Sequence, residues 1–562
     1  MPPCDLAVTI RYDKEMIPSI PFANSALKAF MIRDLFFFSL LILGGLQATC
    51  QADESRPHIV MAFADDWGKY ASAYAALEPG GISDLVETPH FDAVANEGIL
   101  FTRAFVSAPS CTPCRSSLLS GQHFWRCDRA SILQGAIWDM SIPSYPLILE
   151  EDGYRIGHTY KVWSPGSPVD APHGGKDRRF VSQGRKFNRF SQVAMAAGDH
   201  EAGKAELLAE IRGNIRSFLD SDGDGTLDGD QPICYWLGPT NCHRKWIAGS
   251  GKELWGIDPD DLKGKLPAYL PDVATVREDI ADYLGEVQAF DAGLGVLREE
   301  LQRVGIADET VLVVSGDHGI PGIPRGKCNL YDLGTQVPLA IRAPGRIKNP
   351  GRVVDDFVSL PDLAPTFLEL AGSRQPETMI ARSLVPIFAS EKSGQVDPDR
   401  DAVFTGRERH VAQARTGNKP YPQRAIRTGR YLYIINFEPD RWPMGTAPGF
   451  GEEPGPMPSY EVLREKTFAA FADLDASPTK AWVIDHRQEA PKYFEYAVSR
   501  RPKHELYDLR RDPDCLENLA ESDDHRTTRR QLHDRLMEEL RSTGDPRVVG
   551  ELIYERPPFA GD

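Results

Sequence analysis

Positive charge is scarce in this chain. Its 64 lysines and arginines stand against 81 aspartates and glutamates, which leaves a net charge of −17 over 562 residues. This acidic balance argues against a nucleic-acid partner, because affinity for a polyanion comes largely from neutralising its phosphates. An anionic substrate would therefore have to be bound by a local pocket of basic side chains.

Long apolar runs are also missing, apart from one near the N-terminus. In "MIRDLFFFSLLILGGLQATCQAD", Arg33 precedes an apolar run from Leu35 to Leu46, and small residues follow. The run is short for a membrane span, and its flanks are typical of a secretory signal rather than of a buried helix. We expect a signal region over residues 1–52, no stable membrane span after its removal, and export to the periplasm or the extracellular space. Residues 1–30 fit no export signal, so a start at Met31 stays open.

Cysteines are few, and the sequence contains no internal repeat. Seven of the nine cysteines follow residue 52, where an oxidising compartment would permit disulfides. An odd count raises the question of which cysteine is reserved for chemistry. The stretch "SAPSCTPCRSSLLSGQH" (107–123) contains a C-x-x-C pair, but it lacks a thioredoxin-like context and the nearby ligands of a structural zinc.

The same stretch predicts a short helix. Pro113 suits a first helical turn and Gly121 suits the helix end, which places Cys111 at or before the N-terminus. Backbone N–H groups and the helix dipole favour an anion there. Arg115, four residues after Cys111, can lie on the same face.

Two apolar runs predict buried strands that end in acidic pairs. "HIVMAFADDWG" (58–68) stops at Asp65 and Asp66, and "TVLVVSGDHG" (310–319) stops at Asp317 and His318. An amphipathic helix is expected between them at 283–305. This alternation indicates an α/β fold with a parallel sheet, and ligands bind such sheets beyond the carboxyl ends of the strands.

A polar stretch at 390–401 predicts a domain boundary. We expect a catalytic domain over 53–395 and a smaller C-terminal subdomain over 402–562. The latter contains a strand-like run at 425–437 and a closing helix around Leu532, Leu536 and Leu540.

The segment "TPHFDAVANEGILFTRAFVSAPSCTPCRSSLLSGQ" resembles the signature of the sulfatase family. In that family, C-x-P-x-R marks the cysteine that a maturation enzyme oxidises to formylglycine, so the resemblance implies that Cys111 is the nucleophile precursor and Cys114 fills a variable position. One hydroxyl of the hydrated aldehyde attacks sulfur, and the other later expels sulfate. The resemblance also implies an alkaline-phosphatase-like fold, with a mostly parallel sheet flanked by helices and a smaller C-terminal α+β domain.

The resemblance also assigns a metal site. Asp65 and Asp66 match the family's first acidic pair, while Asp317 and His318 match its second pair, where asparagine is more usual than histidine. Together with Cys111 they are the implied ligands of one calcium ion, which favours hard oxygen donors. Without the second pair, Asp65 and Asp66 could equally cap a helix.

A sulfate pocket follows in the same way. "EDGYRIGHTYKVWSPG" places Lys161, "GPTNCHRKW" places His243, and "PRGKCNLYDLGTQVPLAIRAPG" places Lys327 at catalytic positions of the family. With Arg115 they supply the basic pocket that the chain otherwise lacks. As isolated residues, the histidine would more often lie in a core and the lysines on a solvated face.

Three positions bear on the substrate. Trp163 stands where the family has a histidine two residues after Lys161, which removes one proton donor and adds an aromatic wall suited to a sugar face. "GRERHVAQARTGNKPYPQRAIRTGRYLYI" (406–434) resembles the heparan N-sulfatase branch, in which Glu408 and Arg409 match substrate-contacting positions.

The insertion "DSDGDGTLDGDQ" (220–231) is not explained by the family. Asp220, Asp222 and Asp224 have the spacing of an EF-hand calcium loop, but Gln231 replaces the bidentate glutamate. The insertion predicts either a second, structural calcium site or a solvated acidic turn.

We therefore expect an exported, calcium-dependent sulfatase that acts on a sulfated carbohydrate or a related small ester, with a slight preference for an O-sulfate. A sulfamidase that cleaves N-sulfate and a phosphonate or phosphodiester hydrolase of the same superfamily are the alternatives within the enzyme class. From another class, an unmatured chain could only bind sulfated glycans.

Overall fold

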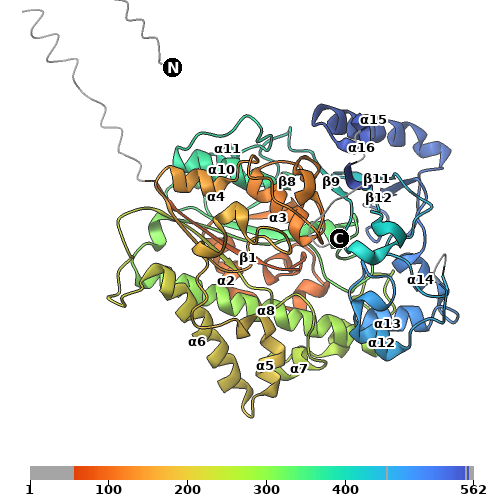
Figure 1. The fold of residues 1–562 in the computed structure, drawn as a ribbon, viewed down its shortest axis with the longest axis horizontal. Helices are drawn as coiled ribbons and strands as arrows, with labels where there is room; N and C mark the ends of the chain where they lie inside the picture. The colour runs from red at the N-terminus through yellow and green to blue at the C-terminus, as the bar shows by residue number, and fades with distance from the viewer. Residues whose placement is uncertain (1–55, 451–453, 551–552, 556–562) are drawn as a thin grey trace, which may run out of the picture. The chain divides into compact units, whose positions relative to one another are not determined.

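Two β-sheets organise the part of the chain that this computed structural model describes, residues 56–450, 454–550 and 553–555. The expected signal region lies outside the described residues. Figure 1 shows the first sheet between two layers of helices, with the elements of the second sheet toward the C-terminal, blue end of the chain. This arrangement confirms the expected helix-flanked sheet and the additional C-terminal sheet.

The first sheet has eight strands, in the order β3-β4-β1-β5-β6-β2-β7, with β8 paired to β2. Most neighbours are parallel, and β6 is antiparallel to both β5 and β2. The strands are β1 (His58–Ala64), β2 (Ile99–Phe105), β3 (Arg155–Tyr160), β4 (Ile233–Gly238), β5 (Thr310–Gly316), β6 (Gln336–Arg342), β7 (Arg352–Val354) and β8 (Val358–Ser359).

Strand β1 shows why this sheet is buried on both faces. All seven of its residues are buried, and alternate side chains enter different cores. Val60 packs in one core and Met61 in the other, as the period of two in a strand requires. The continuous apolar run at 58–64 was therefore a correct indication of a central strand.

Helices cover both faces of the sheet (Figure 1). One core contains residues of α2 (Pro89–Asn96), α5 (Phe190–Ala196), α6 (His200–Leu219), α7 (Ser250–Trp255) and α8 (Ala274–Arg303). The other contains residues of α3 (Cys111–Ser120), α4 (Tyr145–Glu151), α10 (Leu363–Ala371) and α11 (Val385–Phe388). A further short helix, α9 (Asp332–Thr335), precedes β6.

The second sheet is antiparallel, in the order β12-β11-β10-β9. Its strands are β9 (Ala402–Arg407), β10 (Gln423–Thr428), β11 (Tyr431–Asn436) and β12 (His504–Asp508), and its helices are α12 (Tyr460–Glu465), α13 (Pro478–Asp485), α14 (Pro491–Val498), α15 (Arg526–Ser542) and α16 (Pro546–Val549). The single strand expected at 425–437 is wrong: Gly429 and Arg430 form a turn, and Thr428 and Tyr431 bond across it, so the run folds into a hairpin.

Helix α15 closes the C-terminal region as expected. Leu532, Leu536 and Leu540 are buried on one face of this helix, and Gly544 follows it in the left-handed conformation that often ends helices. Among the described residues, no helix combines the length and apolarity that crossing a bilayer requires.

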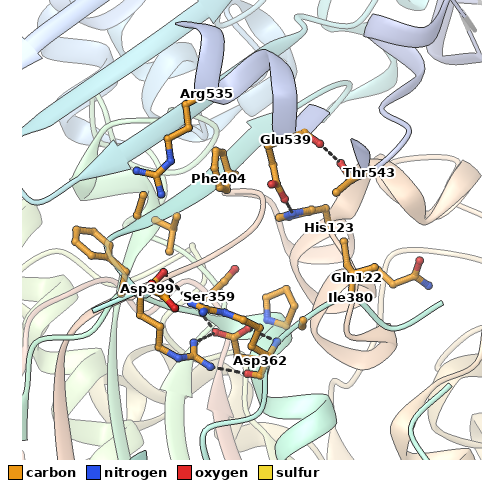
Figure 2. Close-up of a pocket in the computed structure, with 17 residues that line it drawn as sticks. Gln122, His123, Ser359, Asp362, Ile380, Asp399, Phe404, Arg535, Glu539 and Thr543 are labelled. Carbon is orange, nitrogen blue, oxygen red and sulfur yellow. Dashed lines mark hydrogen bonds and ion pairs between the residues drawn. The ribbon is translucent and has the colours of Figure 1, made fainter. Parts of the chain in front are cut away.

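A cavity of about 370 Å³ lies where α15 meets the rest of the molecule. Figure 2 shows its walls, which include Phe404 of β9, Arg535 of α15 and the pair formed by His123 and Glu539. The His123 Nε2 atom lies 2.9 Å from Glu539 Oε1. None of the residues expected to act in catalysis lines this cavity, so the site has to be sought elsewhere.

Candidate active site

Cys111 is the first residue of α3 and follows the N-cap residue Ser110. Gly121 ends the helix with a left-handed backbone, as its position in the sequence suggested. The Cys111 side chain is buried, and this burial raises the pKa of its thiol well above the ordinary value. Its position at a helix N-terminus suits chemistry on an anion.

The two acidic pairs meet beside Cys111 because their strands are neighbours. Strands β1 and β5 are parallel and in register up to Ala64 and Gly316, so the residues that follow them emerge side by side. The Asp66 backbone N–H donates to Asp317 Oδ1 at 2.7 Å. The two acidic pairs therefore lie together at the carboxyl edge of the sheet, where the sequence had placed them.

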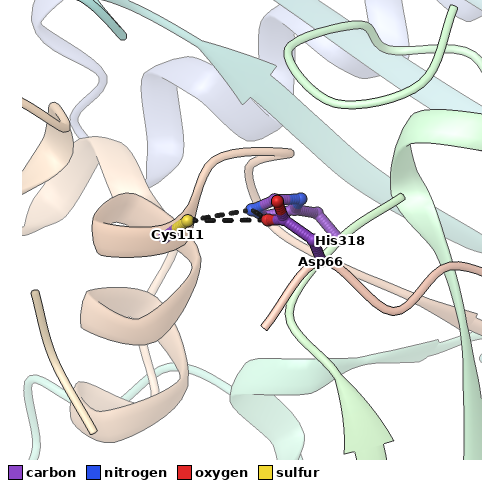
Figure 3. Close-up of side chains that lie close together, drawn as sticks. All are labelled: Asp66, Cys111 and His318. Carbon is purple, nitrogen blue, oxygen red and sulfur yellow. Dashed lines mark hydrogen bonds and ion pairs between the residues drawn. The ribbon is translucent and has the colours of Figure 1, made fainter. Parts of the chain in front are cut away.

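Figure 3 shows Cys111, Asp66 and His318 facing one another. The Cys111 sulfur lies 3.2 Å from His318 Nε2 and 3.8 Å from Asp66 Oδ1, and these last two atoms are 3.1 Å apart. A second triad of Asp65, Cys111 and Asp317 also has its ligand atoms within 4.8 Å of one another.

These donors fit a hard divalent cation. Three buried carboxylates supply anionic oxygens, which calcium prefers, and one imidazole nitrogen completes the cluster. A soft metal would favour thiolate or several imidazoles instead. His318 is the least typical calcium ligand of the set.

Arg115 ties the two acidic pairs together. Its Nε lies 2.9 Å from Asp317 Oδ2 and its Nη2 lies 3.1 Å from Asp65 Oδ1, with the guanidinium fully buried. Two further donations from Nη1 reach the backbone carbonyls of Lys161 and Val162. Arg115 therefore fixes the relative positions of the groups around Cys111.

Two lysines face the same carboxylates. Lys161 Nζ lies 2.6 Å from Asp65 Oδ1, and Lys327 Nζ lies 3.0 Å from Asp66 Oδ2. Burial alone would raise the pKa of Asp65, but Lys161 and Arg115 hold it well below its usual value. The cluster thus keeps the Asp65 carboxylate ionised and brings the positive charges of Arg115, Lys161 and Lys327 together.

His243 lies at the solvent side of this cluster. Its Nδ1 lies 2.6 Å from the Arg244 carbonyl oxygen, so Nδ1 donates there and Nε2 is the ring nitrogen left for the site. The Nε2 atom lies 3.9 Å from Asp66 Oδ2, and the side chain is 38% exposed. A substrate could reach this nitrogen from solvent.

The expected substrate contacts are not placed in the site. Trp163 is fully buried and donates through Nε1 to Ser116 Oγ at 2.8 Å, so it offers no wall to a sugar. The Glu408 carboxylate is fully buried and ion-paired with Arg424 and Arg547, at 2.9 and 2.6 Å. Arg409 is also buried and donates to the Gln134 carbonyl, so these three side chains serve packing and cohesion.

Two residues near the site escaped the sequence analysis. Asp475 Oδ2 lies 3.5 Å from Lys327 Nζ, and His410 Nδ1 lies 2.8 Å from Ser110 Oγ. Burial, with Lys327 adding to it, lowers the pKa of His410 to about 3, so its ring is neutral. His410 lies in the stretch 406–434, where Glu408 and Arg409 were selected instead, and Asp475 belongs to no motif. Only the packing of the C-terminal region against Ser110 and Lys327 reveals the position of both.

Asp475 stabilises the protonated form of Lys327. Burial would lower the pKa of this lysine, but Asp475 and Asp66 outweigh it and hold the pKa well above its ordinary value. Lys327 is therefore protonated and can bind an anion or donate a hydrogen bond to it.

Six cysteines besides Cys111 lie within the described residues, and none of them forms a disulfide. The seven cysteines among the described residues are all buried and unpaired. Cys114 lies in the core between the first sheet and α3, which agrees with the expectation that it packs rather than reacts.

Two family models match the chain. The sulfatase model covers residues 57–373, and the model "N-sulphoglucosamine sulphohydrolase, C-terminal" covers residues 325–445. The first match spans more than half of the chain and includes every candidate ligand and basic residue of the site.

Individual proteins are similar to this chain over most of its length. A human protein named N-sulphoglucosamine sulphohydrolase is 27% identical over 551 aligned residues, which cover 91% of this chain and 93% of the relative. An ulvan-active sulfatase of Formosa agariphila is 23% identical, with 89% of this chain and 77% of the relative covered. The phosphonate monoester hydrolase of Agrobacterium radiobacter has a similar fold, with a TM-score of 0.58, 19% identity, and 88% and 97% of the two chains covered.

Proposed function

Because the chain belongs to the sulfatase family, whose members hydrolyse sulfate esters, we propose that it removes sulfate from a sulfated sugar with a formylglycine made from Cys111. One observation carries this proposal. Cys111 stands at a helix N-terminus, and the acidic pairs that follow β1 and β5 surround it together with Arg115, Lys161 and Lys327.

The proposed cofactor is one calcium ion held by Asp65, Asp66, Asp317 and His318. The aldehyde hydrate would supply two hydroxyls, one that attacks sulfur and one that later expels sulfate as the aldehyde re-forms, and the cation would activate the attacking hydroxyl at neutral pH. The convergence of Asp65 with Asp317 and of Asp66 with His318, each pair beside Cys111 with ligand atoms within 4.8 Å of one another, supports a cation here.

The basic residues then have separate roles. Lys161 and Lys327 would bind the sulfate oxygens, where positive charge stabilises the charge that develops in the transition state. Arg115, fully buried and bonded to both Asp65 and Asp317, is a positioning residue for the acidic pairs. The pocket thereby supplies locally the positive charge that the acidic chain lacks.

Proton donation to the leaving group falls to His243 and Lys327. In its imidazolium form, His243 would present a proton on Nε2 from the solvent side, where the sugar of a bound substrate would lie. Lys327 carries a proton that Asp475 and Asp66 stabilise. An amine or alkoxide leaving group needs such a donor, because it departs poorly as an anion.

For the substrate we infer an N-sulfated glucosamine, on the strength of the human relative and of the C-terminal model that shares its name. An O-sulfated sugar is the second candidate, because a Bacteroides thetaiotaomicron relative that is 25% identical is named N-acetylglucosamine-6-O-sulfatase. Export and maturation by a formylglycine-generating enzyme complete the proposal and agree with a sulfated-carbohydrate substrate outside the cytoplasm.

The test is a substrate panel with purified, matured protein in calcium. N-sulfoglucosamine, glucosamine 6-O-sulfate, a nitrophenyl sulfate and a phenyl phosphonate monoester are compared by kcat/KM. We expect N-sulfoglucosamine to be the best of the two sugars and the phosphonate to be the poorest of the four. If kcat/KM is highest on the phosphonate, the chain is a phosphonate hydrolase. If kcat/KM is higher on glucosamine 6-O-sulfate than on N-sulfoglucosamine, only the N-sulfate assignment is overturned.

A further inference from the structure

We propose that the acidic loop between α6 and β4, residues 220–231, binds a second calcium ion with Asp220, Asp222 and Asp228. The ligand atoms of these three carboxylates lie within 4.8 Å of one another. The loop lies between Lys161 and His243 in the sequence and contains none of the candidate active-site residues, so this site is independent of the proposed function.

The structure revises the expected ligands. Asp228, which the sequence analysis did not select, joins Asp220 and Asp222, whereas Asp224 accepts hydrogen bonds from the Thr226 N–H and hydroxyl groups at 2.8 and 2.7 Å. Counted from Asp220, Asp228 occupies the ninth position of an EF-hand loop, which is one of its ligand positions. Gly225 has a φ of 91°, which gives the sharp turn that the glycine of such a loop provides.

An unpartnered buried oxygen points to a ligand. The Asp220 side chain is only 2% exposed, and its Oδ2 accepts from Arg303 Nη1 at 2.6 Å and from the Gly225 N–H at 3.2 Å. Its Oδ1 is buried and has no hydrogen-bond partner among the described residues. A buried carboxylate oxygen without a partner is costly, and a cation shared with Asp222 and Asp228 would satisfy it.

The charge of the loop favours a cation over a solvated turn. Five aspartates and no basic residue lie within 220–231, and Arg303 compensates only one of them. Carboxylate oxygens at this density repel one another unless a cation lies among them. Calcium suits the irregular oxygen arrangement better than magnesium, which requires near-octahedral geometry.

The affinity should be modest. Gln231 replaces the bidentate glutamate of an EF-hand, and fewer charged ligands weaken calcium binding. We expect a dissociation constant on the order of 10⁻⁴–10⁻³ M, the range of extracellular calcium modules. Such a site would be filled outside the cytoplasm and would fix the connection between α6 and β4.

The test is amide hydrogen exchange of the full-length protein, read from peptides that cover 219–232, with calcium at roughly 10 mM or with chelator. We expect calcium to slow exchange in this loop in the wild type and not in the variant Asp222→Asn/Asp228→Asn. Asparagine keeps an acceptor for the Ser221 N–H, which now donates to Asp228 Oδ2, so the variant should fold. Asp230→Asn, an acidic neighbour outside the cluster, is the matched control and should keep the protection.

A second measurement guards against a folding defect. The single variant Asp222→Asn, at an exposed position, should raise the calcium concentration for half-protection about tenfold. Identical exchange of the wild-type loop with calcium and with chelator would overturn the proposal, as would calcium protection that survives in the double variant.

Discussion

Single side chains decide the electrostatics of the active site. Asp66 lies within 3.0 Å of Lys327 Nζ and 3.1 Å of His318 Nε2, and its backbone N–H is bonded to Asp317. Each charge of the site thus faces an opposite charge at short range, in an interior where such interactions are screened little. Removing one partner should therefore cost more than the pair contributes.

His243 is the residue whose role can be tested most selectively. We expect His243→Ala to lower kcat/KM on a sulfated sugar by about 10²–10⁴-fold, because the leaving amine or alkoxide needs a proton. A nitrophenyl sulfate has a good leaving group, so its kcat/KM should fall by roughly tenfold or less.

Lys245→Ala is the matched control, because this neighbouring lysine is exposed and bonded to Glu465. It should leave both substrates within about twofold of the wild type. Equal losses on the two substrates for His243→Ala would mean that the histidine binds sulfate, and Lys327 would then be the better donor.

The relative positions of residues within one local motif could be predicted from the sequence. The surroundings of a residue outside such a motif could not. Cys111 and Arg115 lie on one short helix, so their relation is fixed by helical geometry and could be predicted. Glu408 was selected by similarity alone, and the sequence gives no sign that Arg424 and Arg547 bury and neutralise it. Long-range ion pairs of this kind appear only in the folded chain.

Helix α8 shows how one element is held by buried carboxylates. Asp282 accepts from the Gly251 N–H, Glu286 accepts from the Ser191 N–H, and Asp291 accepts from the His90 and Phe91 N–H groups. These carboxylates bond to amides and hydroxyls rather than to cations, and burial raises the pKa of each to about 7.

Raised carboxyl pKa values make a definite prediction for stability. Between the unfolded value near 4 and the folded value near 7, the folded protein binds more protons than the unfolded chain, so the free energy of unfolding falls as pH rises through this range. For Glu286 we expect a loss of roughly 1–3 kcal/mol between pH 5 and pH 8. Glu286→Gln should remove this contribution to the free energy of unfolding, so the melting temperature should depend less on pH.

The exposed Glu278 on the same helix provides the comparison. Glu278→Gln should leave the pH dependence of the melting temperature as it is in the wild type. Glu286→Gln can still fold, because Asn241 Oδ1 is buried without a hydrogen-bond partner among the described residues and can accept from the new amide. A steeper pH dependence in Glu286→Gln would contradict the raised pKa.

Elements were predictable where apolar periodicity was strong. Strands β1 and β5 were expected from continuous apolar runs, and both are central in the sheet. Helix α8 begins at Ala274, earlier than the expected start at 283. Val276, Ile280 and Leu284 continue its buried face back into the first turns, so this part of the apolar stripe was overlooked. The β10–β11 hairpin was missed since a single glycine, Gly429, is a weak signal for a turn inside an apolar run.

Residues from the C-terminal region and from the part of the chain around the first sheet meet at the candidate active site. Asp475 and His410 come from the C-terminal region and lie against Lys327 and Ser110, which belong to the part of the chain around the first sheet. The second sheet begins at Ala402, where the sequence predicted a new subdomain, while the described residues from Arg56 onward form one compact unit. The domain boundary predicted at 390–401 therefore stays a prediction. The candidate active site has neighbouring residues from both sides of it.

The central claim is that the catalytic group is an aldehyde made from Cys111. It is tested by measuring sulfate release per chain against the fraction of chains in which the Cys111 peptide has lost about 18 Da, the mass change from cysteine to formylglycine. Preparations made with and without a maturation enzyme supply the range, and Cys111→Ala supplies the zero point. We predict that sulfate release rises in proportion to the converted fraction and vanishes in Cys111→Ala, while Cys114→Ala keeps most of it. Undiminished sulfate release from chains with unconverted Cys111 would contradict the account.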